Sequence, residues 1–272
     1  MKHTARKRFG QNFLHDQEVI NRIIACIAPR ETDLLVEIGP GQAALTRPLL
    51  ESGAELHLLE LDRDLVSRLQ KQFSDKSNIT IHSGDALNAN LPEITGHRPF
   101  RLIGNLPYNI STPLIFHVLQ WHEQVVDMHF MLQKEVVDRM AAAPGSRTYG
   151  RLSVMTQYRC NVTPLFDVHP ESFSPVPRVS SSIVRLQPLK KPPADTGSFD
   201  NFKKVVSAAF SMRRKTLRNS LKELFTTDQI LAADIDPGQR AEQLSLSQFA
   251  TLASSLTYDA DRKPASEKPT SR

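Results

Sequence analysis

The sequence predicts an α/β protein, with a Rossmann-like domain followed by a smaller C-terminal α-helical domain. Three observations indicate this fold class. Short apolar runs alternate with amphipathic helical stretches between residues 34 and 142, which is typical of a parallel sheet. A Gly-Pro-Gly turn follows the first run, where Rossmann-like folds bring their backbone close to a ligand. A segment rich in Pro and polar residues at 188–197 precedes a part with only helical periodicity.

Residues 1–15 are predicted to form a basic, partly extended N-terminal arm, and residues 16–189 the domain that contains the sheet. Asp16 can cap a helix at 17–28, because apolar side chains recur there at helical spacing and Pro29 follows. Further helices are expected at 43–51, 62–73, 113–121 and 135–142. Strands are expected at 34–38, 56–61, 79–82, 100–103 and 125–132, with late antiparallel strands at 152–161 and 181–189.

The C-terminal part is divided into a linker at 190–198, a helical domain at 199–258 and a disordered tail at 259–272, which is charged and almost without apolar residues. Apolar side chains between 202 and 224 share one face of a single long helix at 202–223. Arg213 projects onto that face. Either the helix breaks near Ser211, or Arg213 leaves the core to reach a ligand.

Other classes of protein are disfavoured by what the sequence lacks. The two cysteines, Cys26 and Cys160, give neither a disulfide framework nor zinc-ligand spacing, and the nine histidines show no metal-ligand pattern. No apolar run is long enough to span a membrane, and the basic N-terminus lacks the apolar core of a signal peptide. We therefore expect a cytoplasmic protein without a metal or a membrane partner, and we also expect a monomer.

Asn105, Leu106, Pro107 and Tyr108 follow the predicted strand at 100–103, where open α/β sheets bind ligands. An adenine amine is a poor nucleophile because its lone pair is delocalised into the ring. An Asn carbonyl and a nearby backbone carbonyl can accept its two hydrogens, Pro107 offers no competing N–H, and Tyr108 can stack on the base. The motif indicates methylation of a nucleobase amine. A plain Asx-Pro turn with a packed tyrosine is the alternative.

The Gly39-Pro40-Gly41 turn and Glu60, at the end of the next strand, form a candidate cofactor site. The glycines let the backbone approach a ligand, and Glu60 can accept two ribose hydroxyls. The same glycine spacing, with Ala44 and a distant acid, also fits a nicotinamide dinucleotide. No hydride-transfer constellation is visible, and three further features favour a methyltransferase. They are the acid Glu37 before the turn, the Asn105 motif, and Asp85, which can receive an adenine amine or merely form a turn.

The chain has a formal net charge of +5, and many of its basic residues lie in two clusters. Either cluster alone could be a solvated face. Two clusters on either side of a base-handling motif favour a nucleic-acid partner. The N-terminal cluster contains Lys2, Arg6, Lys7 and Arg8, and the C-terminal cluster contains Arg213, Arg214, Lys215, Arg218 and Lys222.

Together these residues resemble the ribosomal RNA adenine dimethyltransferase family, and more narrowly its bacterial members that modify small-subunit rRNA. The similarity extends to about residue 258, and its motifs are specific as a set although each is weak to moderate alone. Ala43 departs from the many methyltransferases that have a third glycine there. The motifs lie at 6–14, 37–41, 60–62, 105–112, 128–135, 149–153, 173–175 and 213–221.

The resemblance implies a class I S-adenosylmethionine-dependent methyltransferase domain that releases S-adenosylhomocysteine. It implies that the target base lies between Tyr108 and Phe173, and that both basic clusters contact RNA. The implied cofactor contacts are Asn12, Leu14, Gly39, Glu60, Asp85 and Asn105.

The implied activity is dimethylation of the exocyclic amines of two adjacent adenosines near the 3′ end of 16S rRNA, in an assembling small ribosomal subunit. A large-subunit rRNA adenine methyltransferase of the resistance type is an alternative. A non-catalytic RNA-binding assembly factor and a nicotinamide-dependent oxidoreductase are the others.

Overall fold

The computed structural model describes residues 12–107 and 110–256. The N-terminal basic cluster, Tyr108 and the tail at 259–272 therefore lie outside the described residues. The chain divides into two compact units, Met1–Pro192 and Pro193–Arg272, and this division falls within the segment 190–198 that we predicted as a linker. Among the described residues, no helix is long and apolar enough to cross a membrane.

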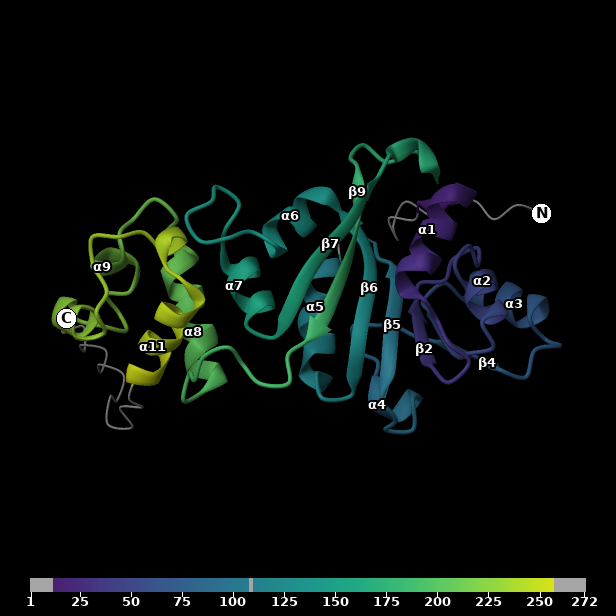
Figure 1. Cartoon of the computed structure of the whole chain (residues 1–272), viewed down its shortest axis with the longest axis horizontal. Coiled ribbons are helices and arrows are strands. Elements are labelled where there is room, and N and C mark those ends of the chain that lie inside the picture. The colour runs from purple at the N-terminus through teal and green to yellow at the C-terminus, as the bar shows by residue number, and fades with distance from the viewer. Residues whose placement is uncertain (1–11, 108–109, 257–272) are drawn as a thin grey trace, which may run out of the picture. The chain divides into compact units, whose positions relative to one another are not determined.

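The first unit is built on a seven-stranded sheet with the order β4-β3-β2-β5-β6-β9-β7 (Figure 1). The first five strands in this order are parallel, and β9 and β7 add to them antiparallel. The predicted α/β class is thus confirmed. The strands are β2 (Leu34–Ile38), β3 (Glu55–Glu60), β4 (Ile79–Ser83), β5 (Phe100–Asn105), β6 (Val125–Gln133), β7 (Cys160–Val168) and β9 (Ser181–Pro188).

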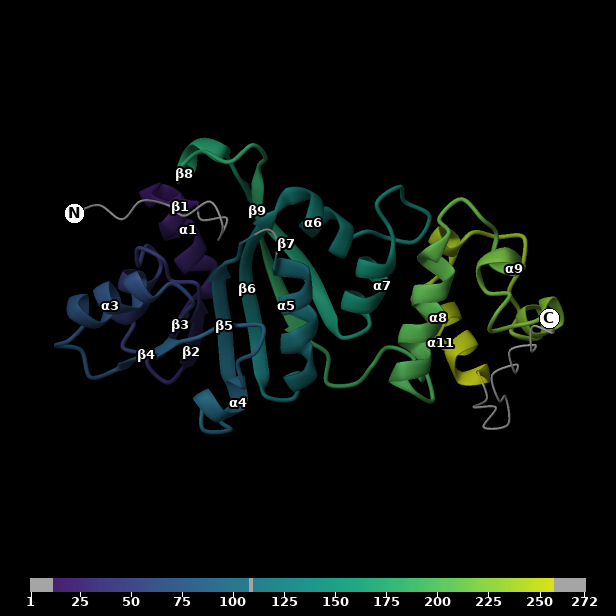
Figure 2. The ribbon, with the colours of Figure 1, turned by 180° about the vertical axis from the view of Figure 1, so that it is seen from behind.

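Helices cover both faces of the sheet because successive side chains of a strand point to opposite faces. Leu35 packs with α1 (Gln17–Ile27), α2 (Thr46–Glu51) and α3 (Arg63–Gln72) in one core cluster. Val36 packs in a second cluster with apolar side chains from four further helices. These are α4 (Leu91–Ile94), α5 (Ser111–Val118), which continues into the 3-10 helix η2 (Leu119–Trp121), α6 (Lys134–Met140) and α7 (Arg151–Gln157). Helices α5, α6 and α7 are seen in Figure 2.

The predicted cap of α1 is confirmed, and Asp62, where a helix was expected to begin, is a cap as well. Asp16 Oδ1 accepts hydrogen bonds from the backbone N–H groups of Glu18 and Val19 and so caps α1. Asp62 caps α3 in the same way, by accepting from Asp64 N. These caps set the entry of each helix close to the end of the preceding segment.

The strand predicted at 152–161 is wrong, since Arg151–Gln157 is the helix α7 and the strand β7 begins only at Cys160. Five consecutive residues of α7, Leu152 to Thr156, are buried, so no polar face marks a helical period. Tertiary contacts decide the helix. Ser153 Oγ donates to Arg139 O, and Gln157 Nε2 donates to the carbonyls of Met140 and Ala142, which fixes α7 against the end of α6.

The second unit is helical, but the single helix predicted at 202–223 is also wrong. The helix α8 (Phe199–Ser211) ends at Ser211, the first of the two outcomes that Arg213 suggested. The Arg213 side chain is 62% exposed, and its Nε lies 3.6 Å from Glu242 Oε2. The remaining elements are α9 (Leu217–Ser220), α10 (Thr227–Ala232), the 3-10 helix η4 (Ala241–Gln243) and α11 (Leu246–Ser255).

Two short strands bring distant parts of the first unit together. β1 (Phe13–Leu14) pairs antiparallel with β8 (Phe173–Ser174), with Phe13 opposite Ser174 and Leu14 opposite Phe173. The 3-10 helix η3 (Pro170–Ser172) leads into β8. The end of the predicted N-terminal arm is thereby joined to a segment that follows β7.

Candidate active site

A cavity of about 280 Å³ lies at the carboxyl ends of β2, β3, β4 and β5. It is where an open α/β sheet is expected to bind a ligand. All the residues predicted to contact a cofactor line this cavity, namely Asn12, Leu14, Gly39, Glu60, Asp85 and Asn105. Leu106, Pro107 and Phe173 line it as well.

The glycine turn lines this site. Its backbone conformation and the closeness of Phe13 both favour glycine over residues with a side chain. Gly39 and Gly41 have φ angles of +65° and +58°, in the left-handed region that favours glycine. A Cβ at Gly41 would lie 3.2 Å from the Phe13 ring. On the neighbouring strand, a Cβ at Gly104 would lie 2.8 Å from Ile38 O, so β5 and β2 need glycine there.

Glu60 is buried at the end of β3 and holds the turn. Its Oε2 accepts from Gly41 N at 3.2 Å, and its Oε1 accepts from Asp62 N at 2.9 Å. Burial raises the pKa of this carboxyl, and the backbone donors offset only part of that effect. A buried carboxylate with only neutral donors can readily accept hydroxyl hydrogens from a ligand.

Glu37 is a second buried carboxyl in the same cavity. Its Oε2 accepts the Thr46 hydroxyl hydrogen at 2.7 Å. Burial raises the pKa of Glu37 to about 7, and the nearby charge of Glu60 adds to the rise. Within the described part of the chain, neither carboxyl is paired with Lys, Arg or His.

Asp85 follows β4 and has both of the features that the sequence suggested. Its Oδ1 accepts from Leu87 N at 2.9 Å, which is the hydrogen bond of an Asx turn. Its Oδ2 accepts from Asn88 Nδ2 at 3.2 Å. Asp85 nevertheless lines the cavity, so turn formation and ligand contact are compatible at this residue.

Asn105 is the last residue of β5, and its amide is oriented by the segment that precedes β1. Asn105 Nδ2 donates to Asn12 O at 3.1 Å, which leaves Oδ1 as the acceptor on the other side of the amide. Leu106 N donates to Met131 O at 3.2 Å and ties the motif to β6. Pro107 O accepts from Ile110 N at 3.1 Å and closes a turn. Asn105, Leu106 and Pro107 are thus held by neighbouring strands and by a turn.

Phe173 lines the cavity from β8, but its side chain is almost fully buried at 2% exposure. Its predicted stacking role stays a prediction. Phe13, from the opposite strand β1, also lines the cavity and was not predicted. No local pattern marks Phe13 as a site residue, because it reaches the glycine turn only through the pairing of β1 with β8.

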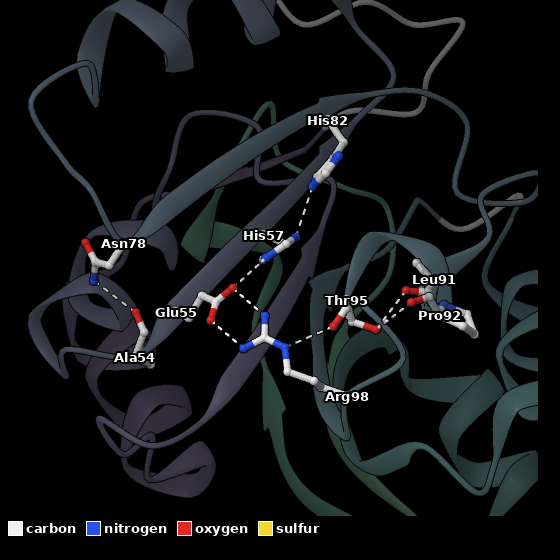
Figure 3. Close-up of polar contacts among 9 residues, drawn as sticks. All are labelled: Ala54, Glu55, His57, Asn78, His82, Leu91, Pro92, Thr95 and Arg98. Atoms are coloured by element: carbon white, nitrogen blue, oxygen red, sulfur yellow. Dashed lines mark hydrogen bonds and ion pairs between the residues drawn. The ribbon is translucent and has the colours of Figure 1, made fainter.

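A second polar cluster lies away from the cavity (Figure 3). Glu55 Oε1 and Oε2 accept from Arg98 at 2.6 and 2.8 Å, and Glu55 Oε1 lies 3.1 Å from His57 Nε2. His57 Nδ1 in turn lies 3.0 Å from His82 Nε2. Each group here has a partner of complementary character, unlike the carboxyls of the cavity. In the described ranges, no group of three or more His, Cys, Asp or Glu residues is arranged to hold a metal ion.

The fold and the position of the cavity define a class I methyltransferase. The crystal structure of a dimethyladenosine transferase from Plasmodium falciparum superposes with a TM-score of 0.76 and 26% identity, over 88% of this chain and 95% of that chain. The structure of 23S rRNA methyltransferase ErmE gives a TM-score of 0.71 and 25% identity, over 90% and 99% of the respective chains.

The chain belongs to the ribosomal RNA adenine dimethylase family, whose model matches residues 2–258. Ribosomal RNA small subunit methyltransferase A from Tolumonas auensis is 50% identical over 256 residues, which cover 94% of this chain and 96% of that protein. The protein of the same name from Hahella chejuensis is 54% identical over 258 residues, or 94% of each chain. The predicted family and the class of enzyme, an rRNA methyltransferase, are confirmed, and the nicotinamide alternative is set aside.

Proposed function

We propose that this enzyme transfers methyl groups from S-adenosylmethionine to the exocyclic amines of two adjacent adenosines near the 3′ end of 16S rRNA, in an assembling small ribosomal subunit. One observation carries the proposal: the oriented Asn105 amide and the cation-free carboxyls Glu37, Glu60 and Asp85 line one cavity. The names of the relatives, which are small-subunit methyltransferases, support the choice of substrate.

The cavity fits a cationic nucleoside ligand. Carboxylates that are buried without a cation are costly unless a ligand compensates their charge. Glu60 would accept the ribose hydroxyls, Asp85 the adenine amine, and the turn at Gly39 would lie against the amino-acid end of the ligand. When bound, S-adenosylmethionine supplies a methyl group that its positive sulfur already activates.

Asn105 would act on the nucleophile. Since Nδ2 is engaged by Asn12 O, Oδ1 faces the other way and can accept one hydrogen of the adenine amino group. A backbone carbonyl of the motif would accept the other hydrogen, and both contacts raise the electron density on the nitrogen. After the first methylation the nitrogen keeps one hydrogen, which the same oxygen can accept for the second transfer.

The base and the RNA would be held by other residues. Tyr108 and Phe173 would enclose the flipped adenine. The segment between α8 and α9 exposes Arg213, Arg214 and Lys215, and Arg218 is exposed on α9. We assign RNA phosphate contacts to this set and to the N-terminal residues Arg6, Lys7 and Arg8.

The test is a methylation assay with labelled S-adenosylmethionine on small subunits purified from a strain that lacks this modification, followed by mass spectrometry of dimethyladenosine. Asn105→Ala should abolish most turnover, while calorimetry shows cofactor affinity reduced far less. Alanine at Arg213, Arg214, Lys215 and Arg218 should weaken RNA binding and reduce its salt dependence by roughly one unit per lost phosphate contact. Near-wild-type dimethylation by Asn105→Ala would contradict the mechanism.

A second substrate belongs in the same assay because the ErmE structure shares the fold across nearly its whole length. Protein-free 23S rRNA should remain unmodified. Modification of 23S rRNA in preference to the small subunit would move the proposal to the large subunit.

A further inference from the structure

The connection between β8 and β9, residues 175–180, presents apolar and cationic side chains to solvent. Val176 is 62% exposed and Val179 is 44% exposed, and no other large apolar side chain in the described ranges is as exposed as Val176. Arg178 between them is exposed, and it makes no hydrogen bond or ion pair with another described residue. An exposed apolar pair with a cation between them is typical of a contact surface rather than of a solvated turn.

The β8–β9 connection is anchored at both ends, and its start is joined to strands that line the cavity. At its start, Ser174 lies opposite Phe13, and Phe173 lies opposite Leu14. Phe13, Leu14 and Phe173 line the cavity. At its end, Ser180 O accepts from Lys134 N at 3.0 Å, directly after β6. Figure 2 shows β8 and the start of β9 near one another at the same end of the sheet.

The connection is also stiff. Pro175 and Pro177 restrict φ on either side of Val176. A stiff segment keeps its apolar side chains in place instead of letting them collapse onto the core. The exposure of Val176 and Val179 is therefore set by the backbone, within a few residues of Phe173, which lines the cavity.

We propose that the β8–β9 connection contacts the nucleotides that flank the target adenosine. Val176 and Val179 pack against the neighbouring bases where the flipped adenine has left the stack, and Arg178 contacts the adjacent phosphate. The proposal rests on the proposed function and adds the residues that separate the target from its neighbours.

The physical argument is that flipping breaks base stacking, which costs a few kcal/mol. Apolar side chains that enter between bases replace part of the lost stacking, and several nucleic-acid-binding proteins use such wedges. A cation between the two valines fits RNA better than an apolar protein partner, since the sugar–phosphate backbone passes beside every flanking base. For two adjacent adenosines, the surface would hold one base while the other is in the pocket.

The first experiment compares methylation of small subunits by wild type, the double variant Val176→Ser/Val179→Ser, and Arg178→Ala. We expect the double variant to lose roughly tenfold or more in kcat/KM, the size of one base–side-chain stacking contact, with an unchanged Kd for S-adenosylmethionine. Val126→Ser and Arg30→Ala are the matched controls. Val126 is 51% exposed near the start of β6, and Arg30 is exposed before β2, both at the opposite end of the sheet.

The second experiment reports on the base itself. An RNA hairpin with the sequence of the 16S 3′ end carries 2-aminopurine beside a target adenosine, and its fluorescence is measured with protein and S-adenosylhomocysteine. Wild type and both controls should increase the fluorescence as the neighbour unstacks, and the double variant should lose most of this increase.

Equal activity and equal fluorescence for the double variant and Val126→Ser would overturn the inference. So would a loss of activity on subunits with an unchanged fluorescence response, because the partner of the surface would then be a ribosomal protein. If wild type methylates neither small subunits nor 23S rRNA, the proposed function is wrong. The fluorescence response then still decides whether the β8–β9 connection contacts the flanking base.

Discussion

Carboxyl groups at the two ends of the parallel sheet have different partners. At the amino end, Arg101 binds Asp33 and Asp127, each at 2.8 Å, and Arg98 binds Glu55 (Figure 3). At the carboxyl end, the carboxyls that line the cavity accept only from neutral donors within residues 12–107 and 110–256. The amino end is complete without a ligand, whereas the cavity at the carboxyl end is electrostatically incomplete.

Strand β3 contains this difference within one element. Glu55 begins the strand, and hydrogen bonding by Arg98 lowers its pKa to about 2. Glu60 ends the strand, and burial raises its pKa. Residue type and strand are the same, so the partner and the degree of burial decide whether a glutamate stabilises the fold or remains available to a ligand.

The largest expected effect comes from removing the cation at the amino end. Arg101→Met leaves Asp33 and Asp127 mostly buried without the arginine that compensates their charge, and we expect it to lower the free energy of unfolding by about 3–5 kcal/mol. Denaturant unfolding measures this. Glu60→Gln is the matched variant at the carboxyl end. It removes a buried charge but leaves either Gly41 N or Asp62 N without an acceptor, so its loss should be smaller than that of Arg101→Met. Equal losses in the two variants would remove the contrast between the ends.

The pH dependence of stability reports on Glu37. Its pKa is about 7 in the folded chain against an ordinary value of 4.5, so the folded chain holds a proton that the unfolded chain has lost between these pH values. Glu37 alone should therefore lower the free energy of unfolding by about 3 kcal/mol as pH rises through this window. Burial lowers the pKa of His129 to about 4, which contributes a slope of opposite sign below pH 6.5.

Glu37→Gln has no proton to lose, so its free energy of unfolding should rise by about 3 kcal/mol relative to wild type across the window, because Glu60 and His129 titrate in both proteins. Unfolding curves between pH 4.5 and 8 test this. An unchanged slope in Glu37→Gln would show that another group is responsible.

A smaller effect is expected for ligand binding at the two ends of β3. Glu60→Gln should weaken S-adenosylmethionine binding by about 1–3 kcal/mol, since it would replace the charged group that we propose as acceptor of the ribose hydroxyls. Glu55→Gln, on the same strand, should leave the affinity unchanged. Calorimetry on the two variants compares them directly, and a similar loss in both would point to a general disturbance of the strand.

The smallest effect is expected for Arg98→Ala. The Arg98 side chain is 54% exposed, and solvent screens its pair with Glu55. The midpoint of denaturant unfolding should not move measurably, but the pKa of Glu55 should rise toward its ordinary value because its main stabilising partner is lost. Carboxyl-carbon NMR titration of Glu55 would detect this, and an unchanged titration would show that His57 alone maintains the charge.

Local patterns are sufficient for much of the fold and the cavity. Gly39, Glu60, Asp85 and Asn105 each end or directly follow an apolar run, and the carboxyl ends of parallel strands meet at one edge of a sheet. The sequence alone therefore predicts that these residues lie close together. The caps at Asp16 and Asp62 are readable for the same reason, since they act within three residues.

Local patterns fail where distant contacts compete with them. The helix α7 is buried around its whole circumference, which hides its period. The apolar face of α8 continues in phase beyond Ser211, yet the chain turns there, and Leu217 N instead donates to Gln239 O at 2.8 Å. In both cases a partner far along the sequence determines the local conformation.

The arginine partners at the amino end and the β1–β8 contact at the cavity depend on tertiary structure alone. Arg101 reaches Asp33 across 68 residues, and Leu14 meets Phe173 through strand pairing. Such contacts follow from the order of the strands in the sheet, and that order is a property of the whole sheet. For most elements of this chain the local sequence specifies the secondary structure and the buried face, whereas the contact partners depend on the complete sheet.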